Sequence, residues 1–317
     1  MSKNMKGNIL LFITAFIWGC AFVAQRTGME YIGPLTFNGI RSLVGGFTLL
    51  IYLFIRNKLQ KNNRVAETSG VNETKLVDKV DRANEIITNP PSKKFTFLCG
   101  LVCGLCLFAG TTLQQMGMVY TTAGKAGFIT ALYIILVPLL GIFLGKKIRL
   151  VVWLGVVLAL IGLYLLCVGE DFSVNKGDML VLLCSFAFTI HITFVDKVSQ
   201  RIDGVVISCI QLFVCGLISV PGMILFEVID WKLILQCTVP ILYAGVLSCG
   251  VAYTLQIVAQ KYTEPTVASM IMSLESVFAL LSGMIVLKET IAPHEIVGCV
   301  VMFAAIILAQ LPDKKSK

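Results

Sequence analysis

The chain has 317 residues, of which 57% are hydrophobic and only 14% are charged, and its mean hydropathy is +0.87. Ordinary soluble domains carry about 25% charged residues, so this composition excludes a soluble globular domain. The net charge of +8 could suggest nucleic-acid binding, but the Lys and Arg residues lie in short segments between apolar runs rather than along one solvated face. Nearly all of the eleven Cys residues lie within apolar runs, where Cys packs as a small hydrophobe.

Apolar runs of about 20 residues, the length that crosses ~30 Å of hydrocarbon, recur along the chain. Because they are continuous rather than alternating, we expect helices and not barrel strands. The first run follows Lys3 and Lys6 but lacks a convincing cleavage site, so we interpret it as a permanent helix and not a signal peptide. The predicted transmembrane helices cover residues 7–25, 35–55, 95–118, 122–144, 150–168, 178–196, 205–227, 238–259, 265–287 and 292–311.

The basic residues predict how these helices cross the membrane. If the N-terminus is cytoplasmic, 20 of the 26 Lys and Arg residues fall inside and only four fall outside. By the positive-inside rule this asymmetry predicts a multi-pass plasma-membrane protein with both termini in the cytoplasm. The one long polar segment, residues 57–94, is rich in Lys, Asn, Glu and Thr; we predict a mostly flexible cytoplasmic linker, which could hold a short helix between Leu76 and Ile87.

The chain also repeats itself. A shift of 170 residues places Ala15–Trp18 on Ser185–Phe188 and Arg41 on Gln211, and after the linker a shift of 142 places Gln114 on Gln256 and Tyr120-Thr121 on Tyr262-Thr263. The predicted units are residues 1–56 and 95–168 as the first repeat, 57–94 as the linker, 177–311 as the second repeat and 312–317 as a cytoplasmic tail.

An odd number of helices per repeat forces the second copy to enter the membrane the other way up. The sequence therefore predicts an all-α polytopic membrane protein of ten transmembrane helices, built as two inverted five-helix repeats. Many transporters use this construction to form inward-open and outward-open states from one sequence. We therefore interpret the chain as a secondary transporter that works by alternating access. The alternative is a membrane-embedded channel or scaffold without coupled transport, which has less need of an inverted repeat.

Several motifs carry a family resemblance. Trp18-Gly19 with Phe22, Arg41, the run 120–124 (YTTAG) and the run 273–279 (SLESVFA) continued to Lys288-Glu289 resemble the EamA-type branch of the drug/metabolite transporter superfamily. The resemblance covers essentially all predicted helices. Ser276 departs from it, since the family commonly has Pro there, and so does Lys125, where a small or polar residue is frequent. The resemblance implies movement of small metabolites such as amino acids, by export or uptake and without ATP; we expect export.

Ionisable side chains at membrane depth are functional candidates, because burying them is costly. Arg41 lies about seven residues into its helix, and it could hold a substrate carboxylate or form a structural ion pair. Glu275, near the middle of its helix, could carry a coupling proton, receive a substrate amine, or neutralise Arg41 or Lys125. Lys125 could face the cavity beside an anionic cargo, or instead extend its ammonium to the lipid headgroups. His191 could shuttle protons or simply be a hydrogen-bonded packing residue.

Uncharged candidates complete the predicted substrate or gating set. Gln114 and Gln256 are equivalent in the repeat, as expected of polar groups that flank a central site, although they could equally join helices. Trp18 and Tyr133 could stack on an aromatic or apolar substrate, or only pack. The sequence contains no P-loop, zinc-type His/Cys cluster or G-x-S-x-G elbow. We therefore expect a non-enzyme without metal or cofactor, whose partners are a small-molecule substrate and the bilayer, with a homodimer left open and no nucleic acid.

Overall fold

The computed structural model describes residues 3–68, 91–121, 123–167, 175–288 and 291–311, and within these ranges the chain forms helices and no strands. The first half contains α1 (Lys3–Met29), α2 (Pro34–Thr68), α4 (Lys93–Gly117), α5 (Ala123–Thr130), α6 (Tyr133–Phe143) and α7 (Leu150–Cys167). The second half contains α8 (Lys176–Ser199), α9 (Gly204–Phe226), α10 (Trp231–Gln236), α11 (Thr238–Leu242), the π-helical η1 (Tyr243–Ala252), α12 (Tyr253–Ala259), α13 (Pro265–Met272), α14 (Glu275–Ser282), the π-helical η2 (Gly283–Leu287) and α15 (Pro293–Gln310).

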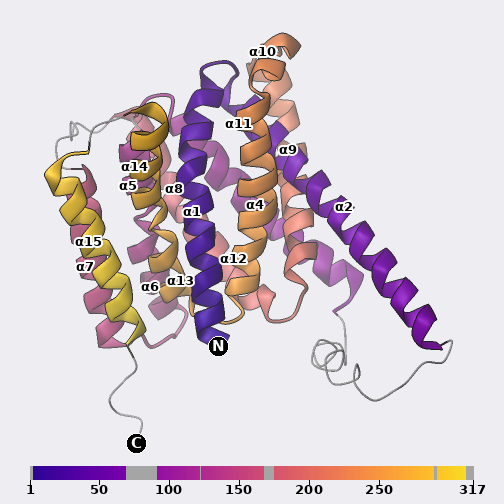
Figure 1. Cartoon of the computed structure of the whole chain (residues 1–317), viewed down its shortest axis with the longest axis horizontal. Coiled ribbons are helices and arrows are strands. Elements are labelled where there is room, and N and C mark those ends of the chain that lie inside the picture. Colours follow the sequence, from indigo (N-terminus) through magenta and orange to yellow (C-terminus); the bar gives the residue numbers. More distant parts are fainter. Residues whose placement is uncertain (1–2, 69–90, 122, 168–174, 289–290, 312–317) are drawn as a thin grey trace, which may run out of the picture.

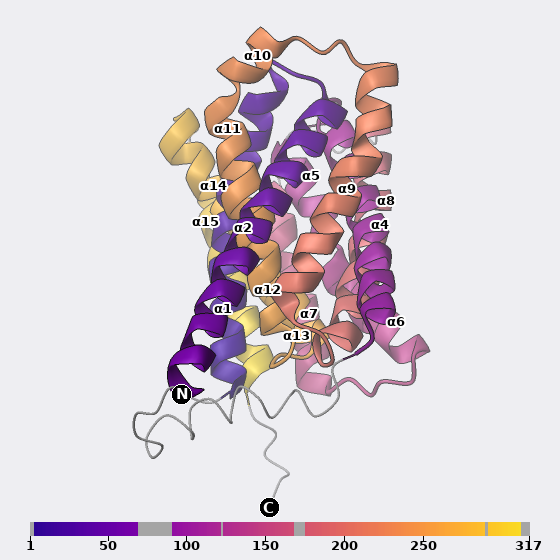
Figure 2. The same cartoon turned by 90° about the vertical axis from the view of Figure 1, so that its right-hand side faces the viewer.

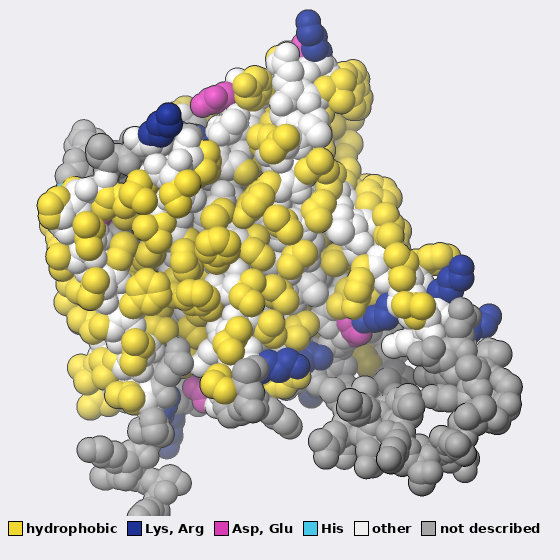
Figure 3. Space-filling view, in the orientation of Figure 1, with side chains coloured by type: hydrophobic (Ala, Val, Ile, Leu, Met, Phe, Trp, Pro, Cys, Tyr) yellow, Lys and Arg dark blue, Asp and Glu magenta, His cyan; other side chains and the backbone are white. Residues whose placement is uncertain are grey.

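The described helices agree with the predicted polytopic architecture. Eight helical segments are long and apolar enough to cross a membrane, and two shorter apolar helices, Leu150–Leu165 and Pro293–Ala309, bring the number of predicted crossings to ten. Figure 3 shows hydrophobic side chains covering the middle of the visible face, with Lys, Arg, Asp and Glu near its two ends. α1 begins and α15 ends at the same end of the bundle (Figure 1), which we call the terminal face; the opposite end is the distal face.

Polar residues at the helix starts explain where several helices begin. The side chain of Asn175 accepts a hydrogen bond from the backbone N–H of Asp178, whose carboxylate accepts one from the backbone N–H of Asn175. The side chains of Asp203 and Asp230 likewise accept hydrogen bonds from backbone N–H groups in the first turns of α9 and α10. Pro265 occupies the first turn of α13, where an N–H group would have no partner within the helix, so its missing N–H costs nothing. These caps satisfy first-turn N–H groups that have no partner within the helix.

α2 is longer than the sequence predicts. It continues to Thr68, into the segment 57–94 that we expect to be a flexible linker. The physical reason is that residues 57–68 contain no Gly or Pro and several good helix formers, so the membrane helix continues into the polar segment. The short helix expected between Leu76 and Ile87 lies outside the described residues.

The packing follows the sequence repeat. α4 packs against α8, and the counterparts of these two helices, the segment η1–α12 and α1, pack together in the same way. The contact of α2 with η1 has its counterpart in the contact of α9 with α4. Two further pairs join a helix to its own counterpart, namely α2 with α9 (Figure 2) and α7 with α15 (Figure 1). This pattern is expected when two inverted copies meet about an axis in the membrane plane.

Close packing at the crossing of α2 and η1 depends on glycine. A Cβ at Gly45 would lie 2.7 Å from the Cβ of Cys249 and 2.8 Å from the carbonyl oxygen of Gly245. We expect Gly45→Ala to destabilise the protein by about 1–3 kcal/mol through overpacking, measured as a lower melting temperature in detergent. Gly141→Ala is the matched control, because the nearest atom to its added Cβ is 3.8 Å away. Equal melting temperatures for both variants would contradict this packing.

Candidate functional site

Two transmembrane crossings that we expect as single helices are broken at equivalent positions. Residues 122–144 contain α5 and α6, which are separated at Ala131-Leu132, and residues 265–287 contain α13 and α14, which are separated at Ser273-Leu274. The shift of 142 relates the two breaks. At each break the backbone makes tight i to i+3 hydrogen bonds, from the N–H of Ile134 to the carbonyl of Ala131 and from that of Ser276 to that of Ser273.

In each broken crossing, the helix that follows the break begins with a residue that faces the other crossing. Tyr133 opens α6 and its counterpart Glu275 opens α14. The Tyr133 hydroxyl donates a hydrogen bond to Oε1 of Glu275 at 2.9 Å, and both side chains are buried. A buried hydrogen bond thus joins the two inverted repeats at these breaks.

A small cavity of about 40 Å³ lies beside this contact. The two repeats contribute equally to its lining: Trp18, Phe22, Gln25, Arg41, Gln114 and Thr130 come from the first, and Phe188, His191, Ser248, Tyr253, Gln256 and Glu275 come from the second. Two pairs, Trp18 with Phe188 and Gln114 with Gln256, are repeat counterparts. Ligand pockets usually measure about 300–1,000 Å³, so this structure shows the cavity contracted to roughly the space of one water molecule.

Arg41 is positioned by neutral groups. Its Nε and Nη2 donate to Oδ1 of Asn38 at 3.1 and 3.0 Å, and its guanidinium lies 5.6 Å from the centre of the Phe37 ring. Nδ2 of Asn38 in turn donates to Oγ1 of Thr112 at 3.1 Å. Among the described residues no carboxylate lies within 4.0 Å of Arg41, so the ion pair with Glu275 that the sequence allows is not formed here. Arg41 is 3% exposed and lines the cavity with its charge available.

Two acceptor oxygens beside the cavity have no hydrogen-bond donor among the described residues. Oε1 of Gln25 and Oε1 of Gln256 are buried and accept no hydrogen bond from the described protein atoms. Nε2 of Gln114 donates to Oγ1 of Thr130 at 3.1 Å. Unpaired buried acceptors are costly, so Gln25 and Gln256 offer a polar ligand, or water, two buried hydrogen-bonding sites.

His191 and Trp18 are held by partners from other helices. Nε2 of His191 lies 3.0 Å from Oε1 of Gln211, which is the repeat counterpart of Arg41. Nε1 of Trp18 donates to the carbonyl of Ser248 at 3.3 Å, and its ring lies 4.8 Å from that of Tyr253. An aromatic wall therefore borders the cavity on the side of α1 and α12.

The structure thus gathers most of the predicted site residues. Arg41, Glu275, Gln114, Gln256, Trp18 and His191 line the cavity, and Tyr133 lies one hydrogen bond behind it. Lys125 belongs to α5, and its side chain is outside the part of the chain that the structure describes. Our sequence reasoning missed Phe22, Gln25, Thr130, Phe188, Ser248 and Tyr253. The repeat could have indicated Phe188 through Trp18, and Gln25 is a polar residue within an apolar run.

The two faces of the bundle differ. At the terminal face a vestibule of about 920 Å³ is lined by residues of α1, α8, α13 and the neighbouring loops, among them Asn8, Lys146, Asp196, Gln260 and Lys261. Lys146 and Asp196 form an ion pair of 2.8 Å at its edge. No residue lines both the vestibule and the cavity.

At the distal face the end of α9 closes onto the start of α2. The carboxylate of Glu227 accepts hydrogen bonds from the backbone N–H groups of Leu35 and Thr36, both at 2.7 Å. The carboxylate packs so closely over Gly33 that a side chain there would collide with it. An anion at a helix N-terminus is electrostatically favourable, so Glu227 links the two repeats at this face, and we call this contact the Glu227 clamp.

Comparisons with known proteins agree with this architecture. The sequence matches the EamA-like transporter family over residues 5–168 and 175–311. It is 27% identical to an "Uncharacterized transporter" of Archaeoglobus fulgidus, over 98% of this chain and 87% of that protein. It is 23% identical to the "Uncharacterized inner membrane transporter YedA" of Escherichia coli, over 95% of this chain and 89% of that protein.

A solved crystal structure of another protein shares the fold, with a TM-score of 0.71 over 96% of each chain at 15% sequence identity. The relatives' names describe transporters, one of them of the inner membrane, which is consistent with a multi-span protein of the plasma or inner membrane. Both copies of the repeat fall within the family match. The protein therefore belongs to the EamA-like transporter family.

Proposed function

We propose that the protein is a secondary transporter of small zwitterionic metabolites, with apolar and aromatic amino acids as its first candidate substrates. The observation that carries this proposal is the central cavity, where Arg41 from one repeat and Glu275 from the other line the same small space. Neither is neutralised by an ion pair with a described residue. A cation and an anion in one cavity match a cargo that carries both charges.

The chemistry of each group suggests how such a cargo is held. The planar guanidinium of Arg41 suits a carboxylate, which it can bind through two parallel hydrogen bonds. Glu275 suits an ammonium group, and Tyr133 holds its carboxylate in place at 2.9 Å. Trp18 and Tyr253 present aromatic faces to an apolar side chain. Gln25 and Gln256 would then satisfy their buried oxygens on cargo donors or on water carried with them.

We further propose that the two repeats give alternating access to this cavity. The vestibule at the terminal face and the Glu227 clamp at the distal face suit a state that is closed on the distal side. The inverted repeat supplies the opposite state when the two copies exchange conformations. The cavity of about 40 Å³ must expand to accept an amino acid, so cargo binding and the conformational change are coupled.

The proposed orientation places the terminal face, with both termini, in the cytoplasm of a plasma-membrane protein, because the basic residues concentrate there. The vestibule then opens to the cytoplasm, from which an exporter takes its cargo, and export is the direction that we propose. Since the sequence contains no nucleotide-binding motif, ion or substrate gradients would supply the energy. Glu275 and His191 remain the candidates for carrying a coupling proton.

Counterflow in proteoliposomes tests the function. Vesicles preloaded with 10 mM unlabelled L-phenylalanine are diluted into trace labelled L-phenylalanine, and we expect a transient, saturable accumulation that L-leucine inhibits and L-glutamate and L-lysine do not. Exchange of this kind needs a carrier that binds cargo alternately on two sides. Linear uptake without counterflow would support a channel, and the absence of counterflow with both labelled L-phenylalanine and labelled L-leucine, by folded protein, would contradict the proposed substrate class.

A further inference from the structure

A second hollow lies on the outside of the bundle, between α4 and α8 at the terminal face. It measures about 640 Å³, and its floor is formed by Leu98, Cys99 and Val102 of α4 and by Phe194 and Val198 of α8. These side chains are all apolar. We call this hollow the α4–α8 groove. It is separate from the central cavity, with which it shares no residue.

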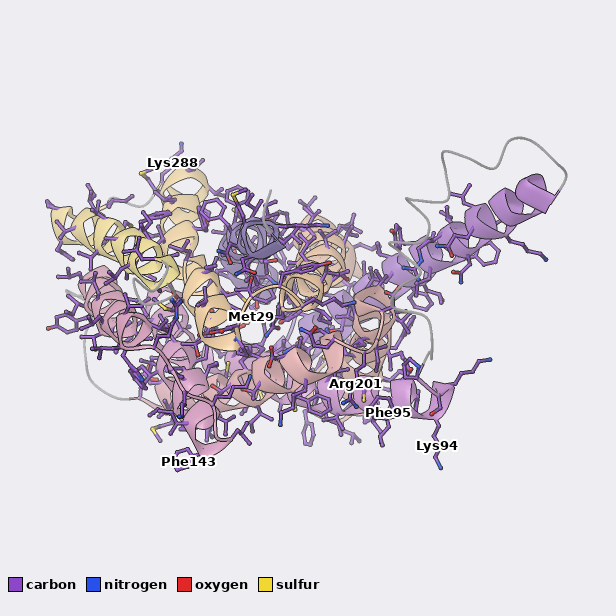
Figure 4. The ribbon with its side chains drawn as sticks, turned by 90° about the horizontal axis from the view of Figure 1, so that it is seen from below. Met29, Lys94, Phe95, Phe143, Arg201 and Lys288 are labelled. Carbon is purple, nitrogen blue, oxygen red and sulfur yellow. The ribbon has the colours of Figure 1, made fainter. Side chains whose placement is uncertain are left out.

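Two basic side chains stand at the open end of the groove. Lys197 and Arg201 line it, are four residues apart and are both exposed. Among the described residues neither has a carboxylate within 4.0 Å. Lys94 and Phe95, at the start of α4, lie on the same side of the bundle as Arg201 when it is seen from the terminal face (Figure 4). The groove therefore has an apolar floor and an unpaired cationic rim.

The groove lies within the depth of one leaflet of a bilayer. On α4 it runs from Phe95 to Val102, which corresponds to roughly 10 Å along the helix at about 1.5 Å per residue. The hydrocarbon core of a bilayer is about 30 Å thick, so one leaflet contributes about half of that. A lipid with its headgroup at Lys197 and Arg201 would lay one acyl chain along the floor.

The repeat shows that the fold does not require this rim. The shift of 170 relates Lys197 to Thr27 and Arg201 to Tyr31, at the junction of α1 with the distal loop. The same pair of helices packs there without either charge. The packing of this helix pair therefore does not require Lys197 and Arg201.

From these observations we propose that the α4–α8 groove binds an anionic phospholipid of the leaflet at the terminal face. Its phosphate would contact Lys197 and Arg201, and an acyl chain would contact the apolar floor. Basic pockets between transmembrane helices are suited to anionic headgroups. Because α4 and α8 belong to different repeats, a bound lipid would bridge the two halves and stabilise the arrangement seen here.

Lipid-dependent melting of the purified protein in a neutral detergent tests the proposal. Palmitoyl-oleoyl phosphatidylglycerol is expected to raise the melting temperature more than the phosphatidylcholine of the same chains, since it binds the folded state preferentially. The variant Lys197→Gln/Arg201→Gln should need roughly tenfold or more phosphatidylglycerol for the same rise. Lys176→Gln/Lys232→Gln removes the same net charge at the distal face and should behave as the unmodified protein does.

Two further measurements distinguish binding of a lipid in the groove from other causes of the rise in melting temperature. Leu98→Trp fills the floor without changing charge, and it is expected to weaken the response to phosphatidylglycerol. Glycerol 3-phosphate, which carries a phosphate but no acyl chain, should give no rise. Equal responses in the two double variants would reduce the effect to general electrostatics and overturn the site, as would equal responses of the unmodified protein to the two lipids.

Discussion

Replacing Glu275 with glutamine is expected to reduce L-phenylalanine counterflow at least tenfold while leaving the protein folded in the membrane. Hydrogen bonds to charged groups contribute about 1.5–3 kcal/mol, and each 1.4 kcal/mol changes a binding constant about tenfold. Glutamine retains the shape and can still accept from the Tyr133 hydroxyl, whose bond to Glu275 measures 2.9 Å. The loss would therefore report the missing charge. Arg41→Gln is expected to have an effect of similar size, because it removes the partner for the cargo carboxylate.

Two controls distinguish charge from packing. Tyr133→Phe removes the hydroxyl that holds Glu275 but keeps the charge, so a smaller loss of counterflow is expected. Lys232→Gln removes an exposed charge from α10 at the distal end and should leave counterflow unchanged. Gel filtration and melting temperature establish folding for every variant. Full counterflow by both Glu275→Gln and Arg41→Gln would exclude the cavity as the cargo site.

Removing the Glu227 clamp is expected to open the distal face. Glu227→Ala deletes both hydrogen bonds of 2.7 Å to the backbone of Leu35 and Thr36. These are charge-assisted bonds, so the equilibrium constant between the distal-closed and the distal-open state should shift toward the open state by roughly tenfold or more. Cys237 is a natural reporter, since it is 0% exposed and its Sγ donates to the carbonyl of Gly28, close to the start of α2.

The measurement is alkylation of Cys237 by a membrane-impermeant maleimide, followed by peptide mass spectrometry. Faster alkylation is expected for Glu227→Ala, and an intermediate rate for Glu227→Gln, which keeps one carbonyl acceptor for the two N–H groups. The thiols deep within the bundle, such as Cys103, provide an internal control because they should stay unreacted if the protein remains folded. An unchanged rate at Cys237 would show that Glu227 caps a helix without closing the distal face.

The positions of the helices could be predicted from the sequence, because the thickness of a bilayer sets how long an apolar run must be to cross it. The breaks within the fourth and ninth crossings could not be predicted. Ala131 and Leu132 are among the strongest helix formers, and no Gly or Pro stands at either break. At Ser273 the side chain bonds to the carbonyl of Met270 at 2.7 Å, which competes with the helix only weakly. The local sequence therefore does not explain either break.

The site was predictable where its chemistry is unusual for a membrane helix. Arg41 and Glu275 stand out as charges at depth, and the repeat draws attention to Gln114 and Gln256. Thr130 and Ser248 do not stand out, because hydroxyl groups are common in membrane helices, where they bond to their own backbone. The partner of Arg41 was not predictable either. An ion pair with a carboxylate was the natural expectation, whereas the structure uses Oδ1 of Asn38, one turn away.

The two halves of the cavity have similar backbones but different side chains, and this difference affects the kinetics of transport from each side of the membrane. Arg41 corresponds to Gln211, and Glu275 corresponds to Tyr133, so each charge occurs in one copy only. When the copies exchange conformations, the two-fold rotation that relates the repeats does not turn the cavity that opens to one side into the cavity that opens to the other. A carrier built in this way has different half-saturation concentrations and different maximal rates on its two sides. Without an imposed gradient the ratio of maximal rate to half-saturation must still be the same in both directions, so this asymmetry sets where the carrier saturates and not which way the cargo flows.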